Sequence, residues 1–233
     1  MSDWKKQEQT AMEAVAKQFS AKWESGSDPS HAYIRAAGKR VTVNVVTLKP
    51  RGVGQAKTGK PGLRFDKVVI RLMEELRGSL RETVPDDMTV LFTVTAPIRL
   101  ASKTTAALED KIQTLLAQKS PRGKATIHGN RVQIRLLKSK IERAPKMIGF
   151  VHNPDSDPLL LLDMTREMIE LISAETSRRA TRLAGERWLV LISAERYSWL
   201  EAYRKICSQL RMANDFKKIL MVLSDGRVEA LTG

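Results

Sequence analysis

The 233-residue sequence contains one cysteine, Cys207, and only three histidines. A single cysteine cannot form an internal disulfide framework or supply a cysteine-based zinc site. Aromatic residues make up 5% of the chain, so few rings are available to stack on nucleic-acid bases. No hydrophobic run is long enough to span a bilayer, and the N-terminal residues lack the apolar core of a signal peptide. We therefore expect a cytoplasmic protein with no membrane partner.

Negative charge is also in short supply. The chain has 40 Lys and Arg residues against 26 Asp and Glu residues, which gives a formal net charge of +14. Such an excess creates a positive field that attracts polyanions, and nucleic acid is the commonest of them. Since 42% of the residues are hydrophobic, the chain is too apolar for a disordered basic tail. The composition therefore predicts a folded protein that contacts nucleic acid.

One stretch begins like a phosphate-binding loop of an ATPase. Gly54, Gly59 and Lys60 have the spacing G-x-x-x-x-G-K. The next position must carry a hydroxyl that holds Mg²⁺, but here it is Pro61, which also lacks an N–H group to donate to a phosphate. We interpret residues 50–64 as a basic, glycine-rich loop that imitates the motif.

Hydrophobic periodicity predicts a regular mixture of helices and strands. Helices are expected at 4–23, 65–80, 104–117, from 155–158 to 183, and at 195–211. Strands are expected in hairpins at 31–49 and 124–137, and singly at 88–96, 147–152, 187–193 and 218–224. This mixture favours an α/β (α+β mixed) three-layer fold with a central mixed β-sheet. We expect a single domain over 1–233, with a possible inserted hairpin unit at 121–152.

The order helix, hairpin, helix and strand over the first part of the chain resembles the core of the restriction-endonuclease-like superfamily, the PD-(D/E)XK nucleases. The segment "SHAYIRAAGKRVTVNVVTLK" (30–49) carries the resemblance, together with "ISAETSRRATRLAGERWLVLIS" (172–193) and "DFKKILMVLSDGRVEAL" (215–231). Members of this family hold Mg²⁺ between two carboxylates, and a lysine orients the attacking water. The resemblance implies a restriction-endonuclease-like core with an extra β-hairpin unit.

The catalytic positions implied by the resemblance are all substituted in this chain. The first acidic position falls on His31, the second on Asn44 and the lysine position on Val46. A neutral amide loses the charge that holds a metal ion, and valine cannot act on water. The acids that remain as alternatives are Glu8, Glu13, Asp28 and Asp66.

The leading hypothesis is therefore a nucleic-acid-binding protein on a nuclease-like core that lacks catalytic activity and needs no cofactor. Duplex DNA is the favoured partner. The candidate phosphate contacts are Lys39, Arg40, Lys49, Arg51, Lys57, Lys60, Arg64, Lys138, Lys140, Arg143, Arg178 and Arg182. The first alternative is an active Mg²⁺-dependent nuclease whose carboxylates have migrated. The second is a protein-interaction scaffold that binds an acidic partner.

The segment "HNPDSD" (152–157) offers nitrogen and oxygen atoms that could bind a metal ion. The competing interpretation is a loop followed by a helix N-cap, since Asp155 or Asp157 precedes an apolar helical run. We favour the cap. No site for a resident metal ion is expected elsewhere.

Overall fold

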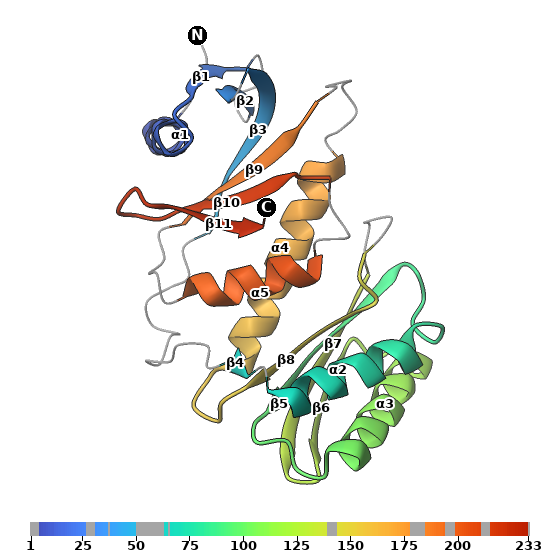
Figure 1. The fold of residues 1–233 in the computed structure, drawn as a ribbon. Helices are drawn as coiled ribbons and strands as arrows, with labels where there is room; N and C mark the ends of the chain where they lie inside the picture. Colours follow the sequence, from blue (N-terminus) through green and yellow to red (C-terminus); the bar gives the residue numbers. More distant parts are fainter. Residues whose placement is uncertain are drawn as a thin grey trace. The chain divides into compact units, whose positions relative to one another are not determined.

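The computed structural model describes residues 5–26, 31–36, 38–49, 63–64, 66–138, 144–177, 185–193, 199–210 and 215–232. Over these residues the chain is mixed α/β, as expected, with five helices and eleven strands in two mixed sheets (Figure 1). Contacts divide it into two compact units. Unit 1 comprises residues 1–55 and 174–233, and unit 2 comprises residues 56–173. Within the described ranges, no helix has both the length and the apolar character needed to cross a membrane.

Unit 1 is built around a six-stranded sheet in the order β1-β2-β3-β9-β10-β11. Its elements are α1 (Lys6–Gln18), β1 (Lys22–Ser25), β2 (His31–Ala36), β3 (Lys39–Thr47), the end of α4 (Pro158–Ser177), β9 (Arg187–Ile192), α5 (Leu200–Leu210), β10 (Lys218–Val222) and β11 (Val228–Thr232). Strand β9 runs parallel to both of its neighbours, and the other pairs are antiparallel.

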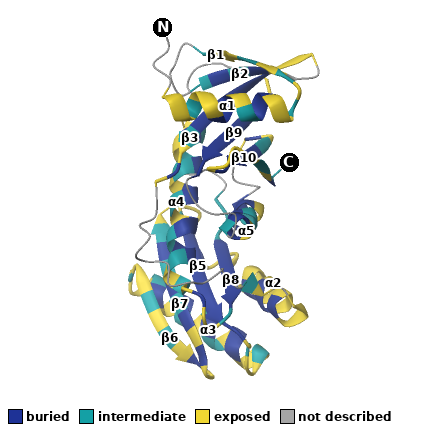
Figure 2. Cartoon of the chain, turned by 90° about the vertical axis from the view of Figure 1, so that its left-hand side faces the viewer, coloured by how far each residue is buried: buried dark blue, intermediate teal, exposed yellow. Residues whose placement is uncertain are grey.

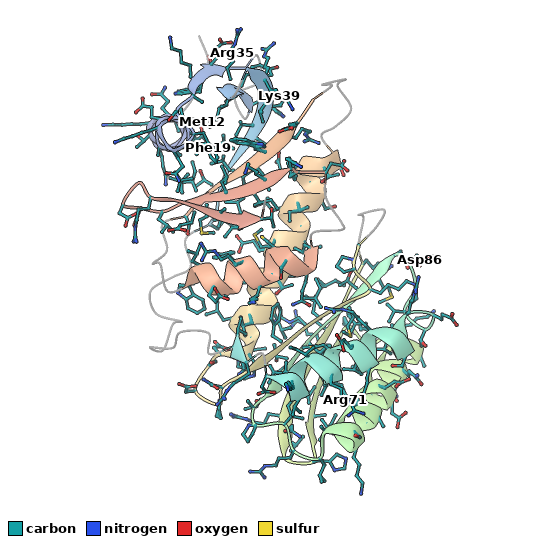
Figure 3. The ribbon with its side chains drawn as sticks, in the orientation of Figure 1. Met12, Phe19, Arg35, Lys39, Arg71 and Asp86 are labelled. Atoms are coloured by element: carbon teal, nitrogen blue, oxygen red, sulfur yellow. The ribbon has the colours of Figure 1, made fainter. Side chains whose placement is uncertain are left out.

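The alternation of β3 assigns its residues to opposite faces of this sheet. Val41, Val43 and Val45 are buried in a core that also contains Val15 and Met12 of α1. Met12 is labelled in Figure 3. Because successive side chains of a strand point to opposite faces, residues 40, 42, 44 and 46 lie on the face away from α1. That face carries the polar residues described below.

Unit 2 contains a five-stranded sheet in the order β4-β8-β5-β7-β6. Its elements are β4 (Leu63–Arg64), α2 (Lys67–Leu80), β5 (Met88–Thr95), α3 (Ala101–Ala117), β6 (Arg122–Ile127), β7 (Asn130–Lys138), β8 (Met147–His152) and the larger part of α4. Strands β5 and β8 are parallel, and the other pairs are antiparallel. Both are buried along most of their length, whereas the edge strand β6 is largely exposed (Figure 2).

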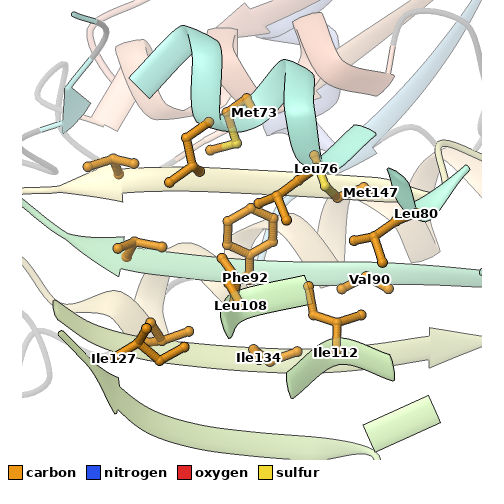
Figure 4. Packing of buried hydrophobic residues seen from close by; sticks show 14 of the residues in the cluster. Met73, Leu76, Leu80, Val90, Phe92, Leu108, Ile112, Ile127, Ile134 and Met147 are labelled. Carbon is orange, nitrogen blue, oxygen red and sulfur yellow. The ribbon is translucent and has the colours of Figure 1, made fainter. Parts of the chain in front are cut away.

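One face of the unit 2 sheet packs against α2 and α3. Leu76 of α2 and Leu108 of α3 are fully buried beside Phe92 of β5 and Ile134 of β7 (Figure 4). Burying a side chain of this size contributes about 1.5–3 kcal/mol, so this cluster accounts for much of the stability of unit 2. The remaining face of the β6–β7 hairpin is polar.

The strands form two sheets where one central sheet was expected. Strand β5 is already paired on both edges, with β7 and β8, so it offers no edge to the hairpin β2–β3. That hairpin instead continues through β9, which lies far along the sequence. The segment expected as an inserted hairpin, 121–152, lies within unit 2 as part of its sheet.

The first helix is shorter than expected. It ends at Gln18 rather than near residue 23, because Ser20 has φ 46°, outside the helical range. Trp23 belongs to β1 and packs on the rim of the core as a strand residue. Its spacing from Phe19 suits either structure, which explains the overextended prediction.

Candidate functional site

The most polar buried cluster in unit 1 is centred on Asn44. His31 of β2 lies directly opposite Asn44 of β3 in the strand register. Asn44 is fully buried, and its Nδ2 donates a hydrogen bond of 2.9 Å to Oε2 of Glu175, from the last turns of α4. The same Nδ2 lies 3.3 Å from Nε2 of His31, which accepts when the neutral ring carries its proton on Nδ1. Two of the three catalytic positions implied by the resemblance therefore meet, with a buried carboxylate beside them.

Basic and aromatic side chains extend this cluster along the same face. Tyr33 lies opposite Thr42, and Arg35 lies opposite Arg40. The Arg40 guanidinium carbon is 3.7 Å from the centroid of the Tyr33 ring, a cation–π contact. We call His31, Tyr33, Arg35, Arg40 and Asn44 the hairpin face.

Arg187 of β9 continues the hairpin face towards α4. It is aligned with Thr42 in the parallel register, and its Nη2 donates a 3.0 Å hydrogen bond to the main-chain oxygen of Glu175. Its guanidinium carbon also lies 4.8 Å from the centroid of the Phe216 ring. Arg187 thus anchors the end of α4 that brings Glu175 to Asn44.

The positive charges at the outer end of the hairpin are only weakly neutralised. Arg35 lies 3.5 Å from Glu24 and Lys39 lies 4.0 Å from Glu186, and all four side chains are exposed (Arg35 and Lys39 are labelled in Figure 3). Exposed ion pairs of this kind contribute little and exchange readily with solvent. These arginine and lysine side chains therefore keep their capacity to bind an anion.

The cluster does not match the Mg²⁺ site that the resemblance implies. Mg²⁺ prefers oxygen ligands in octahedral geometry, and the family pattern requires two carboxylates. Among the described residues around Asn44, only Glu175 brings a carboxylate, and the amide nitrogen of Asn44 already donates to it. The described part of the chain contains no group of three His, Cys, Asp or Glu residues placed to hold a metal ion. The donor set therefore does not fit Mg²⁺.

The alternative acids lie apart from Asn44. Glu13 is exposed on α1, which covers the opposite face of the sheet, and Oε2 of Glu8 accepts a 3.1 Å hydrogen bond from the main-chain nitrogen of Lys5 as part of the α1 cap. Asp66 belongs to unit 2, where its Oδ1 caps α2. Asp28 lies outside the described residues. In the described residues, neither α1 nor α2 therefore brings one of these carboxylates to Asn44.

The candidate phosphate contacts are spread over both units. Lys39 and Arg40 start β3, whereas Lys49 follows its far end, and nine strand residues span about 30 Å. Arg64 and Lys138 belong to unit 2, where Arg64 Nε donates a 2.8 Å hydrogen bond to Asn153 Oδ1. The candidates outside the described residues are Arg51, Lys57, Lys60, Lys140, Arg143, Arg178 and Arg182, together with Gly54, Gly59 and Pro61 of the loop motif. Of the described candidates, only Arg40 lies on the hairpin face, while Lys39 stands next to it at the start of β3.

Val46, the residue at the lysine position, lies two residues beyond Asn44 on the same face and is partly exposed. An aliphatic side chain there supplies neither a proton nor a positive charge.

Glu175 is the residue that sequence analysis missed. It is 131 positions from Asn44, within a helix whose pattern gives no reason to single out one glutamate. Its 4% exposure is the only distinguishing property, and that property depends on the tertiary fold. A buried carboxylate is rare enough to mark a position for attention.

The loop before α4 caps the helix, which confirms the N-cap interpretation of residues 152–157. Asp157 Oδ1 accepts hydrogen bonds from the main-chain nitrogens of Leu159, at 2.9 Å, and Leu160, at 3.4 Å. His152 is 1% exposed, and its Nδ1 lies 2.7 Å from the main-chain oxygen of Asn153. Burial lowers the pKa of the His152 imidazole below its ordinary value of 6.5. The neutral ring is thus a satisfied core residue.

Comparison of the chain with protein-family models, with curated proteins and with solved structures finds no match.

Proposed function

We propose that the protein binds the phosphate backbone of duplex DNA through the hairpin face and does not hydrolyse it. The observation that carries the proposal is that exposed arginines lie on the same face as an amide, Asn44, at a position where the family pattern has an acid. Arg35 and Arg40 lie opposite each other on the hairpin, whereas Asn44 occupies the position where the family pattern requires an acid.

The stacked guanidinium suits a phosphate partner. The guanidinium carbon of Arg40 lies 3.7 Å from the centroid of the Tyr33 ring, and this contact uses none of the guanidinium N–H groups, which can donate to phosphate oxygens. The stack also occupies one face of Tyr33, which limits that ring as a platform for a base. This arrangement favours contact with the backbone over recognition of unpaired bases.

The test is the affinity for a fluorescent 30-bp duplex of mixed sequence, measured by anisotropy over a series of salt concentrations. We expect Arg35→Ala with Arg40→Ala to weaken binding about tenfold and to lower the slope of log affinity against log salt by about 2, one for each lost phosphate contact.

The matched control removes the same charge from the other face of unit 1. Lys6→Ala with Lys17→Ala changes two exposed lysines of α1 and should leave affinity within about twofold of the wild type. Equal losses in both double variants would show that net charge alone drives binding and would overturn the proposal. Unchanged binding by the arginine variant would do the same.

The nuclease alternative now depends on Glu175, the only carboxylate among the described neighbours of Asn44. We propose that incubation of supercoiled plasmid with Mg²⁺ or Mn²⁺ produces no nicking. Nicking that is lost in Glu175→Gln and retained in Glu13→Gln would establish a nuclease and refute the non-catalytic assignment. Glu13 serves as the control because it is exposed on the opposite side of the sheet.

A further inference from the structure

The polar face of the β6–β7 hairpin in unit 2 carries a separate concentration of positive charge. Residues 111–141 contain eight Lys and Arg residues and no Asp or Glu. On β6, Arg122, Lys124 and Thr126 are exposed, whereas Ala125 and Ile127 pack into the core with α2 and α3. The exposed residues therefore point away from α2 and α3.

Strand β7 adds a second row to this face. Its register places Arg135 opposite Arg122, Gln133 opposite Lys124, and Arg131 opposite Thr126. The rows lie about 4.8 Å apart, and alternate residues along each strand lie about 6.6 Å apart. We call these six residues the ribbon face: Arg122, Lys124, Thr126, Arg131, Gln133 and Arg135.

Three of the four cations on the ribbon face have no acidic partner within the described chain. Arg135 Nη1 donates to Asp163 Oδ1 of α4, so its charge is largely neutralised. Arg131 donates through Nη2 to the main-chain oxygen of Pro154, at 3.2 Å, which leaves its charge uncompensated. Arg122 and Lys124 form no ion pair with any described residue. The net charge of the face is therefore strongly positive.

Protection of an edge strand does not by itself account for this pattern. Strand β6 is an edge of its sheet, and a charged residue of either sign prevents association with another edge. Here every charge among the six residues is positive, and the charge of Arg135, which lies opposite Arg122, is already neutralised by Asp163 of α4. Arg122, Lys124 and Arg131 have no acidic partner among the described residues and are placed to interact with an anion that lies over the face.

From this array we propose that the ribbon face is a second binding surface for the backbone of duplex nucleic acid, in addition to the hairpin face. A regular series of cations with neutral donors at Thr126 and Gln133 suits repeating phosphates better than one small anion. The hairpin 122–138 contains no Phe, Tyr or Trp, and its one ring, that of His128, lies at the turn between the strands, so the face itself offers no ring on which an unpaired base could stack. This inference depends on the geometry of unit 2 and does not rest on the hairpin face.

The test uses the full chain and the same 30-bp duplex. We expect Arg122→Ser with Lys124→Ser to weaken binding about tenfold and to lower the salt slope by about 2. The matched control, Lys67→Ser with Arg81→Ser, removes two exposed cations from α2 on the other side of the sheet and should stay within about twofold of the wild type. A thermal melt confirms that each variant is folded.

Each remaining outcome overturns the ribbon proposal. Binding within twofold of the wild type would do so, as would an equal loss in the Lys67 and Arg81 control. Self-association of the Arg122 and Lys124 variant with unchanged affinity per chain would show edge protection alone. Tighter binding of a 30-nucleotide single strand than of the duplex would contradict the assignment to duplex.

The two proposed surfaces can fail separately. If only the Arg35 and Arg40 variant loses affinity, the ribbon proposal is wrong and the hairpin face stands. If only the Arg122 and Lys124 variant loses affinity, the ribbon face stands and the hairpin face is wrong. If both contribute, the combined four-residue variant should lose more affinity than either pair.

Discussion

Two asparagines are buried among the described residues, one in each unit, and they differ in the hydrogen bonds that their side-chain amides make. Asn130 in unit 2 is 1% exposed and has partners for both ends of its side chain. Its Oδ1 accepts a hydrogen bond from the main-chain nitrogen of Arg99 at 3.1 Å. Its Nδ2 donates to the main-chain oxygens of Arg99 and Ile127 and to Oγ1 of Thr104, at 2.9 to 3.2 Å.

Asn44 in unit 1 has different partners. Its Nδ2 faces two titratable side chains, Glu175 and His31, and its Oδ1 is buried without a hydrogen-bond partner among the described residues. A buried amide such as that of Asn130, whose hydrogen bonds go mostly to main-chain groups, stabilises the local backbone conformation. A buried amide whose oxygen accepts no hydrogen bond makes the folded state less stable. Local losses of stability of this kind are typical of binding sites and of former catalytic sites.

The largest effect on stability should follow from replacing Asn130, whose side-chain amide has hydrogen-bond partners at both ends. We expect Asn130→Ala to lower the free energy of unfolding by about 3 kcal/mol, because it leaves several buried main-chain groups without partners. Urea denaturation measures this change. Gln133→Ala, on the half-exposed ribbon face of the same strand, is the control and should change the stability by less than about 0.5 kcal/mol. A loss below about 1 kcal/mol for Asn130→Ala would remove the distinction between the two asparagines.

The substitution Asn44→Asp tests the second asparagine, because it places a second carboxylate next to that of Glu175. Burial and the like charge raise the folded-state pKa of the pair above the ordinary value of about 4. Stability that is present at low pH is then lost as the pH rises towards the raised pKa. We therefore expect the variant to be about 2 kcal/mol less stable than the wild type at pH 7, with a smaller difference at pH 5.

The rate at which Cys207 is alkylated measures the loss of stability that Asn44→Asp causes in unit 1. Cys207 is the only cysteine, it lies in α5, and burial raises its pKa to about 12, so the native thiol should react slowly with iodoacetamide. Asn44→Asp should speed the alkylation, and adding Glu175→Gln should restore most of the lost protection because one charge is removed. A rate equal to that of the wild type at pH 7 would contradict the proposed contact.

The smallest effect concerns His152, the buried histidine of unit 2. Its pKa is lowered in the folded state, chiefly by burial and further by the charge of Arg131, although the Asn153 carbonyl and nearby aspartates oppose the shift. The unfolded chain therefore binds more protons below about pH 6.5, and stability falls as the pH drops through that value.

We expect the melting temperature of the wild type to fall between pH 7 and pH 5 more steeply than that of His152→Gln. His128→Gln changes an exposed histidine of the same unit and should keep the wild-type slope. Parallel pH profiles for all three proteins would show that His152 titrates normally.

Local patterns predicted the elements well where the pattern itself determines the structure. The apolar run at 147–152 is strand β8 at those residues, and the run at 88–96 is strand β5, which is buried on both faces as expected. The stripe over 65–80 is helix α2, whose start is fixed by the Asp66 cap. These features depend on neighbours within a few residues, so one sequence is enough to detect them.

The division into two sheets and the identity of Glu175 could not be predicted in this way. Strand order depends on which edges are left unpaired, and β3 pairs with β9 only after an intervening unit. The hairpin at 31–49 was predicted, and in it the structure pairs His31 with Asn44, the two residues on which the resemblance placed the acidic positions. The resemblance did not indicate Glu175, because no local pattern distinguishes a helix residue that becomes buried from one that stays exposed.

The insertion of unit 2 between β3 and β9 also sets an order of events during translation. A ribosome releases β1, β2 and β3 first, then the whole of unit 2, and only afterwards the strands that complete the first sheet. The growing chain must therefore keep the edge of β3 from associating with other chains while unit 2 emerges. Lys39 and Arg40 lie at the start of β3. Their positive charges are of the kind that keeps an unpaired strand edge soluble until β9 has been synthesised.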